Sequence, residues 1–264
     1  MLKSNQNLSC MQAPIPLDPC KEEKILLAVM PFWPPLIPPQ GISSIKTYLQ
    51  QYGYKVTIVD TNLKQEYREI YDGYFDLLKQ FIPAEKRGNI YIIGNDIFQN
   101  HLMAYLNYQD EKQYRGLLKM LVMKTFFCTV HDGQIVELHR LIAEFYQKLE
   151  ANFLELLAQE KPTILGISVY NLTAPASLFA FKLTKEHFPH IKTIMGGGIF
   201  TSELAADSPN FSYFLERTPY IDKIFVGESE RLLLKYLRGE LPETQRIYTL
   251  EDINFETLNL DTLP

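Results

Sequence analysis

Apolar runs alternate with segments of helical spacing along most of the chain. Residues 24–30, KILLAVM, are apolar enough to be buried on both faces, as a central strand of a parallel sheet is. Residues 42–53 carry apolar side chains three and four positions apart and end in a glycine, which predicts a helix. Residues 54–60, YKVTIVD, form the next expected strand.

Residues 163–200 contain the same pattern as one continuous unit. A β-branched apolar run, TILGISV, opens the unit, a helix-length segment follows, and a second strand ends in Gly196, Gly197 and Gly198. Residues 220–227 predict one further strand, and a capped helix is expected to follow to residue 241.

Strands are therefore expected to begin near residues 24, 54, 163, 191 and 221, with helices between them. This order predicts an α/β fold with a doubly wound, five-stranded parallel sheet, flavodoxin-like or Rossmann-like, in the order 2-1-3-4-5. In such a sheet the ligand crevice lies outside the carboxyl ends of the strands. The loops that follow the strands should therefore form one rim.

Three segments fall outside this alternation. Residues 63–159 are far longer than the dozen or so residues that a crossover needs, and their periodicity is helical, so we expect a helical insertion between the second and third strands. Within it, residues 88–96 allow a short extended piece. Residues 1–22 are polar and rich in proline, which predicts a flexible arm, and residues 242–264 are expected to be a linker.

The amino-acid composition argues against several classes of protein. The chain has 264 residues, of which 46% are hydrophobic, and a net charge of −5. Nucleic acid is not an expected partner, because no basic stripe interleaved with aromatic residues is found. No apolar run reaches membrane-spanning length and the N-terminus lacks the apolar core of a secretion signal, so we expect a cytoplasmic protein without membrane contact. Cys10, Cys20 and Cys128 are at no metal-ligand spacing, and no metal site is expected.

The expected rim is better suited to holding a ligand than to acid–base chemistry. It contains a loop with five prolines, residues 31–41, together with the only tryptophan, Trp33. This loop either covers a large planar cofactor or folds over its own helix. The triple glycine either lets a backbone approach a bulky ligand or forms a tight turn, and three glycines in a row favour the ligand. No nucleophile with a base and no pair of carboxylates falls on the rim, so no catalytic residue is assigned.

Four sequence stretches carry a resemblance to a known family. PFWPPLIPPQGISSIKTYLQQYGYKVTIVD, ILGISVYN, IKTIMGGGIF and IDKIFVGESE resemble the N-terminal cobalamin (vitamin B12)-binding domain of cobalamin-dependent, class B radical S-adenosylmethionine enzymes. The resemblance assigns residues 23–62 and 160–241 to the cobalamin-binding domain. The helical insertion is not part of the family pattern.

The resemblance implies that the corrin lies on the rim and that its nucleotide tail runs down beside the sheet, between the loops after the third and fourth strands. The motif D-x-H-x-x-G, whose histidine ligates cobalt in related proteins, is absent, which implies base-off cobalamin without a protein histidine ligand. The implied cofactor-binding residues are Trp33, Pro34, Pro35, Leu36, Ser168, Val169, Tyr170, Asn171, Leu172, Gly196, Gly197, Gly198, Ile199, Phe200, Gly227 and Glu228.

The resemblance also implies a partner. The cysteine triad C-x-x-x-C-x-x-C of the radical domain is absent, so S-adenosylmethionine and a [4Fe–4S] cluster are expected only in a missing radical domain, on the same gene or a separate chain. The chain would then position cobalamin for methyl transfer or another radical modification of a peptide or small metabolite, without being catalytic alone. The alternatives are a flavodoxin-like interaction or small-ligand module without corrin and a self-sufficient enzyme. If the first interpretation is right, Gly197→Leu should abolish corrin binding and leave the fold largely intact.

Overall fold

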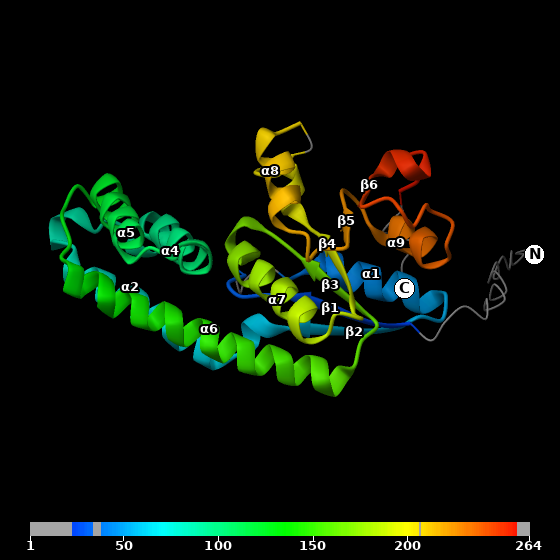
Figure 1. Ribbon diagram of the computed structural model, residues 1–264, viewed down its shortest axis with the longest axis horizontal. Coiled ribbons are helices and arrows are strands. Elements are labelled where there is room, and N and C mark those ends of the chain that lie inside the picture. Colours follow the sequence, from blue (N-terminus) through cyan, green and yellow to red (C-terminus); the bar gives the residue numbers. More distant parts are fainter. Residues whose placement is uncertain (1–22, 34–37, 206, 258–264) are drawn as a thin grey trace, which may run out of the picture.

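The computed structural model describes residues 23–33, 38–205 and 207–257. Their strands form one fully parallel sheet in the order β2-β1-β3-β4-β5-β6 (Figure 1). This confirms the predicted doubly wound α/β fold and the order of its first five strands. The strands are β1 (Lys24–Val29), β2 (Lys55–Asp60), β3 (Ile164–Ser168), β4 (Lys192–Gly196), β5 (Lys223–Phe225) and β6 (Ile247–Tyr248).

The sixth strand was not predicted, and it lies within residues 242–264, which were expected to be a linker. β6 is only two residues long, which is too short to produce a pattern in the sequence. Backbone N–H groups of β5 and the next residue hold it, because Ile224 N donates to Arg246 O at 2.8 Å and Val226 N donates to Tyr248 O at 2.9 Å. The buried ring of Tyr248 also stacks 5.1 Å from the ring of Phe225.

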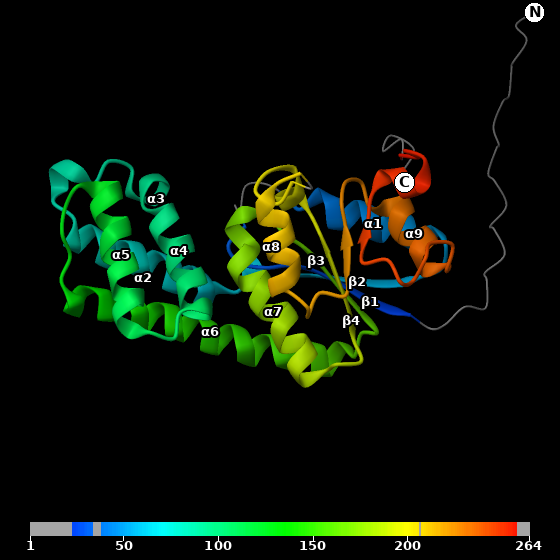
Figure 2. The ribbon, with the colours of Figure 1, turned by 45° about the horizontal axis from the view of Figure 1, so that its top comes forward.

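Helices cover both faces of the sheet. α1 (Gln40–Gln51) and α9 (Glu230–Leu237) lie on one face, and α6 (Asp132–Glu160) and α7 (Ala174–His187) lie on the other (Figure 2). The residues of β1 alternate between these faces: Ile25, Leu27 and Val29 belong to one buried cluster, and Leu26, Ala28 and Met30 to the other. This double burial explains the continuous apolar run that predicted the strand. α8 (Pro209–Arg217) follows β4.

Residues 63–159 form a bundle of helices that extends beyond the carboxyl ends of the strands (Figures 1 and 2). None of residues 88–96 is extended, and Ile90–Ile93 form a helical turn that Asn89 caps: its side-chain oxygen accepts a hydrogen bond from Ile92 N. Besides α6, the helices of this insertion are α2 (Gln65–Phe81), α3 (Ile90–Ile93), α4 (Asn95–Asn107) and α5 (Glu111–Phe126).

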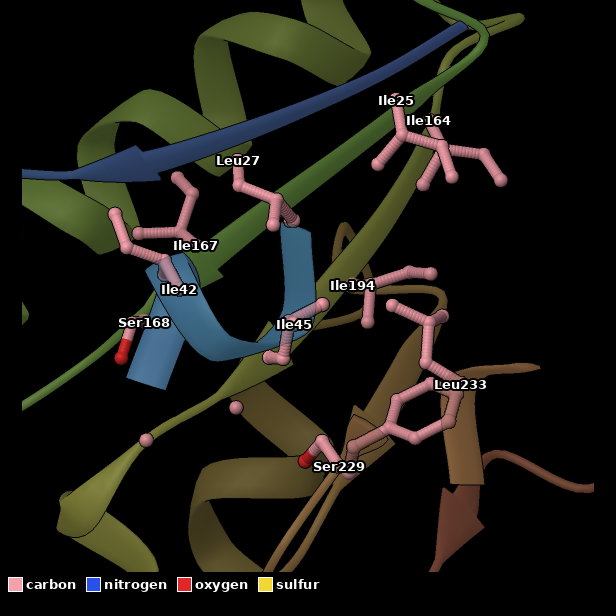
Figure 3. A pocket seen from close by; sticks show the side chains of 14 residues that line it. Ile25, Leu27, Ile42, Ile45, Ile164, Ile167, Ser168, Ile194, Ser229 and Leu233 are labelled. Carbon is pink, nitrogen blue, oxygen red and sulfur yellow. The ribbon is translucent and has the colours of Figure 1, made fainter. Parts of the chain in front are cut away.

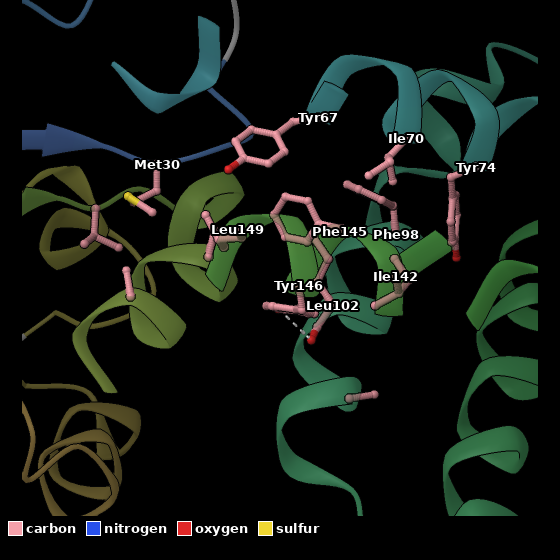
Figure 4. Close-up of a cluster of buried hydrophobic side chains, with 14 of the residues drawn as sticks. Met30, Tyr67, Ile70, Tyr74, Phe98, Leu102, Ile142, Phe145, Tyr146 and Leu149 are labelled. Atoms are coloured by element: carbon pink, nitrogen blue, oxygen red, sulfur yellow. Dashed lines mark hydrogen bonds between the residues drawn. The ribbon is translucent and has the colours of Figure 1, made fainter. Parts of the chain in front are cut away.

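The insertion and the sheet share one hydrophobic core. Figure 4 shows the buried cluster running from Met30, at the end of β1, to Tyr74 in α2. Phe32, in the loop after β1, connects the two parts. Its ring centroid lies 5.1 Å from that of Phe98 in α4 and 5.1 Å from that of Phe145 in α6. The insertion is therefore packed directly against the loop that follows β1.

Candidate functional site: a cleft beside β3 and β4

An apolar cleft lies between the sheet and the helices α1 and α9. We call it the sheet cleft. It has about 490 Å³ of empty space, part of which is open to solvent, and aliphatic side chains from β1, β3, β4, α1 and α9 form most of its wall (Figure 3). Ser168 and Ser229 contribute the hydroxyl groups of the lining. The cleft therefore suits an apolar, flat group with one or two hydrogen-bonding atoms.

Two glycines keep the floor of the sheet cleft open. Alternation along the strands turns Ile164, Gly166 and Ser168 of β3 toward the cleft, next to Ile194 and Gly196 of β4. A Cβ atom at Gly166 would lie 2.7 Å from Leu27 Cδ2, whereas a Cβ atom at Gly196 would lie 3.6 Å from Phe225 O. A larger side chain at position 196 would therefore enter the cleft without a backbone collision.

Gly197 has a structural role that corrects the sequence-based prediction. Its φ angle is +110°, and a Cβ atom would lie 2.4 Å from Val169 O and 2.5 Å from Val169 N. Val169 N donates to Gly196 O at 2.7 Å, and Ile199 N donates to Val169 O at 3.2 Å, which joins the loops after β3 and β4. The expectation that Gly197→Leu leaves the fold largely intact is therefore wrong. A substitution at Gly196 is the one that tests ligand binding in the sheet cleft.

Gly198 supports an aromatic pair on the rim. A Cβ atom there would lie 2.7 Å from Tyr170 Cε1, so the phenol ring packs directly on the glycine. The ring of Tyr170 in turn lies 4.3 Å from the indole ring of Trp33, measured between centroids. Asn62 fixes the backbone of Trp33, because Trp33 N donates to Asn62 Oδ1 at 3.2 Å and Asn62 Nδ2 donates to Trp33 O at 2.9 Å. The three successive glycines thus serve three different purposes.

The other predicted residues divide between the rim and the core. Asn171, Gly227 and Glu228 are exposed on loops after β3 and β5. Leu172 is half-buried, and its carbonyl accepts a hydrogen bond from Phe32 N at 3.4 Å. The side chains that point away from the sheet cleft, into the core on the α7 face, are those of Val169, Ile199 and Phe200. Pro34, Pro35 and Leu36 lie outside the described residues.

Three residues near the sheet cleft were not identified from the sequence. Gly166 has the same strand alternation as Ser168, which was the available signal. Glu230 is the second glutamate of the GESE stretch, and it is buried with 8% of its surface exposed. Ser44 Oγ donates to Glu230 Oε1 at 2.6 Å, which ties α1 to the start of α9. Only the folded chain brings these two residues together, because they are 186 positions apart.

Comparisons with known proteins identify no family: no protein-family model, curated protein or solved structure matches the chain. Within the described residues, no group of three or more His, Cys, Asp or Glu side chains is placed to hold a metal ion. The described helices include none that is long and apolar enough to cross a membrane. The geometry of the sheet cleft therefore carries the functional argument.

Proposed function

We propose that this chain is a cytoplasmic cobalamin-binding module that presents base-off cobalamin to a radical S-adenosylmethionine domain. The observation that supports it is the sheet cleft, which has a floor of glycine and runs from the carboxyl-end rim along the face of β3 and β4. This is the place that the resemblance assigns to the nucleotide tail. The tail ends in a flat, largely apolar benzimidazole base, which suits aliphatic walls and a serine hydroxyl.

The residues of the rim fit the same proposal. Trp33 and Tyr170 form a half-buried aromatic pair, with ring planes 52° apart, next to the triple glycine, where the corrin would rest. His101, His131 and His139 lie in the insertion. His187 ends α7 and His190 lies between α7 and β4, at the amino-end edge of the sheet. None of the five histidines lies in the loops that directly follow β1, β3, β4 and β5, so these loops offer cobalt no histidine ligand.

In this proposal, the cofactor and the chain have separate roles. Bound cobalamin supplies the methyl-transfer or radical chemistry, and the residues of this chain bind and orient it. S-adenosylmethionine and the [4Fe–4S] cluster belong to the radical domain, which is the proposed partner. The substrate is a peptide or a small metabolite that this partner domain contacts.

A titration with hydroxocobalamin tests the proposal. We expect the purified chain to keep corrin absorption after desalting, in the base-off form. Gly196→Leu should weaken binding by about tenfold or more, because its side chain fills the cleft. Gly116→Leu is the matched control, because a Cβ atom at Gly116 in α5 meets nothing within 4 Å.

Two results would contradict the proposal. One is equal affinity in Gly196→Leu and the natural chain, which would place the corrin elsewhere. The other is no corrin retention by the natural chain, either alone or joined to a radical domain. That result would favour the alternative of a flavodoxin-like interaction or small-ligand module without corrin.

A further inference from the structure

A second cleft lies entirely within the helical insertion, where the end of α4 meets the beginnings of α5 and α6. We call it the insertion cleft. It has about 890 Å³ of empty space, part of which is open to solvent. Its walls include Tyr105, Tyr108, Tyr114, Ile135, Val136 and His139.

Packing behind the aromatic walls holds them in place. The ring of Tyr105 stacks on the buried ring of Tyr146, with centroids 4.9 Å apart and planes 11° apart. Tyr146 is fixed in turn, because its hydroxyl donates to Leu102 O at 3.0 Å (Figure 4). On the other side, Tyr114 meets His139 edge to face at 5.3 Å. Walls supported in this way favour a preformed site for a flat ring.

His139 offers a hydrogen-bond donor to this cleft. Its Nδ1 lies 2.9 Å from the Tyr114 hydroxyl. Burial raises the pKa of Tyr114, so the phenol keeps its proton and can donate it to Nδ1. Burial also lowers the pKa of His139, which keeps the ring neutral at pH 7. In the tautomer that accepts from Tyr114, the remaining proton is on Nε2, which makes no hydrogen bond among the described residues.

A second histidine lies behind the wall. His101 is fully buried, and its ring lies 5.4 Å from that of Tyr114 and 6.4 Å from that of His139. Its Nδ1 lies 2.9 Å from the Tyr74 hydroxyl, and its Nε2 has no hydrogen-bond partner among the described residues. An unpaired buried polar atom costs free energy that an apolar residue would avoid. Packing alone therefore does not explain why a histidine, and not an apolar residue, occupies position 101.

The charge at the cleft is balanced. Glu111 and Arg115 lie in its lining and form an ion pair with each other. The histidines are neutral, so the site offers no unpaired charge among the described residues of its lining. A neutral ligand is favoured over an ion.

We propose that the insertion cleft binds a neutral small molecule that carries a flat aromatic ring and a hydrogen-bond acceptor, such as a carbonyl oxygen, on its edge. The ring lies between the tyrosines, and the acceptor takes a hydrogen bond from His139 Nε2. This site is separate from the sheet cleft and does not depend on cobalamin.

Benzamide and cyclohexanecarboxamide form a matched pair of probes, because they share the amide and differ in the aromatic ring. Nitrogen chemical shifts of the histidine rings report binding at His139. We expect saturable binding of benzamide, with a dissociation constant on the order of 1 mM for a ligand of this size, and binding of the saturated analogue about tenfold weaker.

Variants separate the site from non-specific association. His139→Phe keeps a ring and removes the donor, and Tyr108→Ala removes a wall residue that is 43% exposed, so each should weaken benzamide binding by about fivefold or more. Tyr213→Ala, at an exposed tyrosine of α8, should leave binding unchanged. Absence of saturation up to the solubility limit, or unchanged affinity in both cleft variants with native helical content, overturns the proposal.

Discussion

The indole ring of Trp33 lies 4.3 Å from the phenol ring of Tyr170, and this contact joins the loop after β1 to the loop after β3. Trp33 is the only tryptophan of the chain, so intrinsic tryptophan fluorescence reports on the rim alone. We expect hydroxocobalamin to quench this emission saturably, with the same dissociation constant as the absorption titration. Tyr170→Phe, which keeps the ring, should preserve quenching. Emission that does not change while corrin is retained would place the corrin away from Trp33.

Gly197→Ala and Gly196→Ala should differ strongly in stability although they are neighbours. At position 197 the methyl group meets the backbone of Val169 and φ is +110°, so we expect a loss of about 2–4 kcal/mol in the free energy of unfolding. At position 196 the methyl group has room, and the change should stay within about 1 kcal/mol. Urea unfolding followed by circular dichroism measures both, and equal losses would contradict the assigned roles.

The buried histidine His101 should make stability fall in acid. Burial lowers the pKa of His101 to about 3, from an ordinary value of about 6.5, so the unfolded chain binds its proton first. The part of the free energy of unfolding that depends on neutral His101 is fully present above pH 6.5. It is lost as the pH falls toward 3, and the loss is about 2–3 kcal/mol at pH 4.5. His101→Gln should flatten this dependence, whereas His190→Gln, at an exposed position, should not. Unfolding at several pH values compares the slopes, and identical slopes would refute the effect.

The hydrogen bond between Ser44 and Glu230 should stabilise the contact of α1 with α9. Ser44→Ala leaves the buried Glu230 carboxylate without this donor, so we expect a loss of about 1–2 kcal/mol. Ser43→Ala is the matched control, because Ser43 is exposed on the same helix. A double-mutant cycle with Glu230→Gln gives the coupling directly. No coupling would show that the two helices are held by apolar packing alone.

The sequence contains enough information for the first five strands. β1 and β3 are nearly continuous apolar runs that helices bury on both faces, and β2, at the edge of the sheet, is half-buried but still rich in β-branched residues. The sequence cannot reveal β6, which is two residues long and is held by hydrogen bonds that Ile224 N and Val226 N donate to Arg246 O and Tyr248 O. The separate roles of Gly196, Gly197 and Gly198 were also hidden. They depend on Phe225, Val169 and Tyr170, which approach only after the strands align. The order of the strands thus predicts where the rim lies, whereas the shape of the sheet cleft requires the folded chain.

Phe32 and Trp33 are adjacent in the chain but belong to different parts of the molecule. Phe32 packs among the rings of the insertion, and Trp33 faces Tyr170 on the rim. The insertion is therefore not a removable accessory. Replacing residues 63–159 by a short turn would strip the apolar cover from Phe32 and Met30, so shortened versions of this protein should aggregate. For the same reason, residues of the insertion and of the loop after β1 should change together between related sequences.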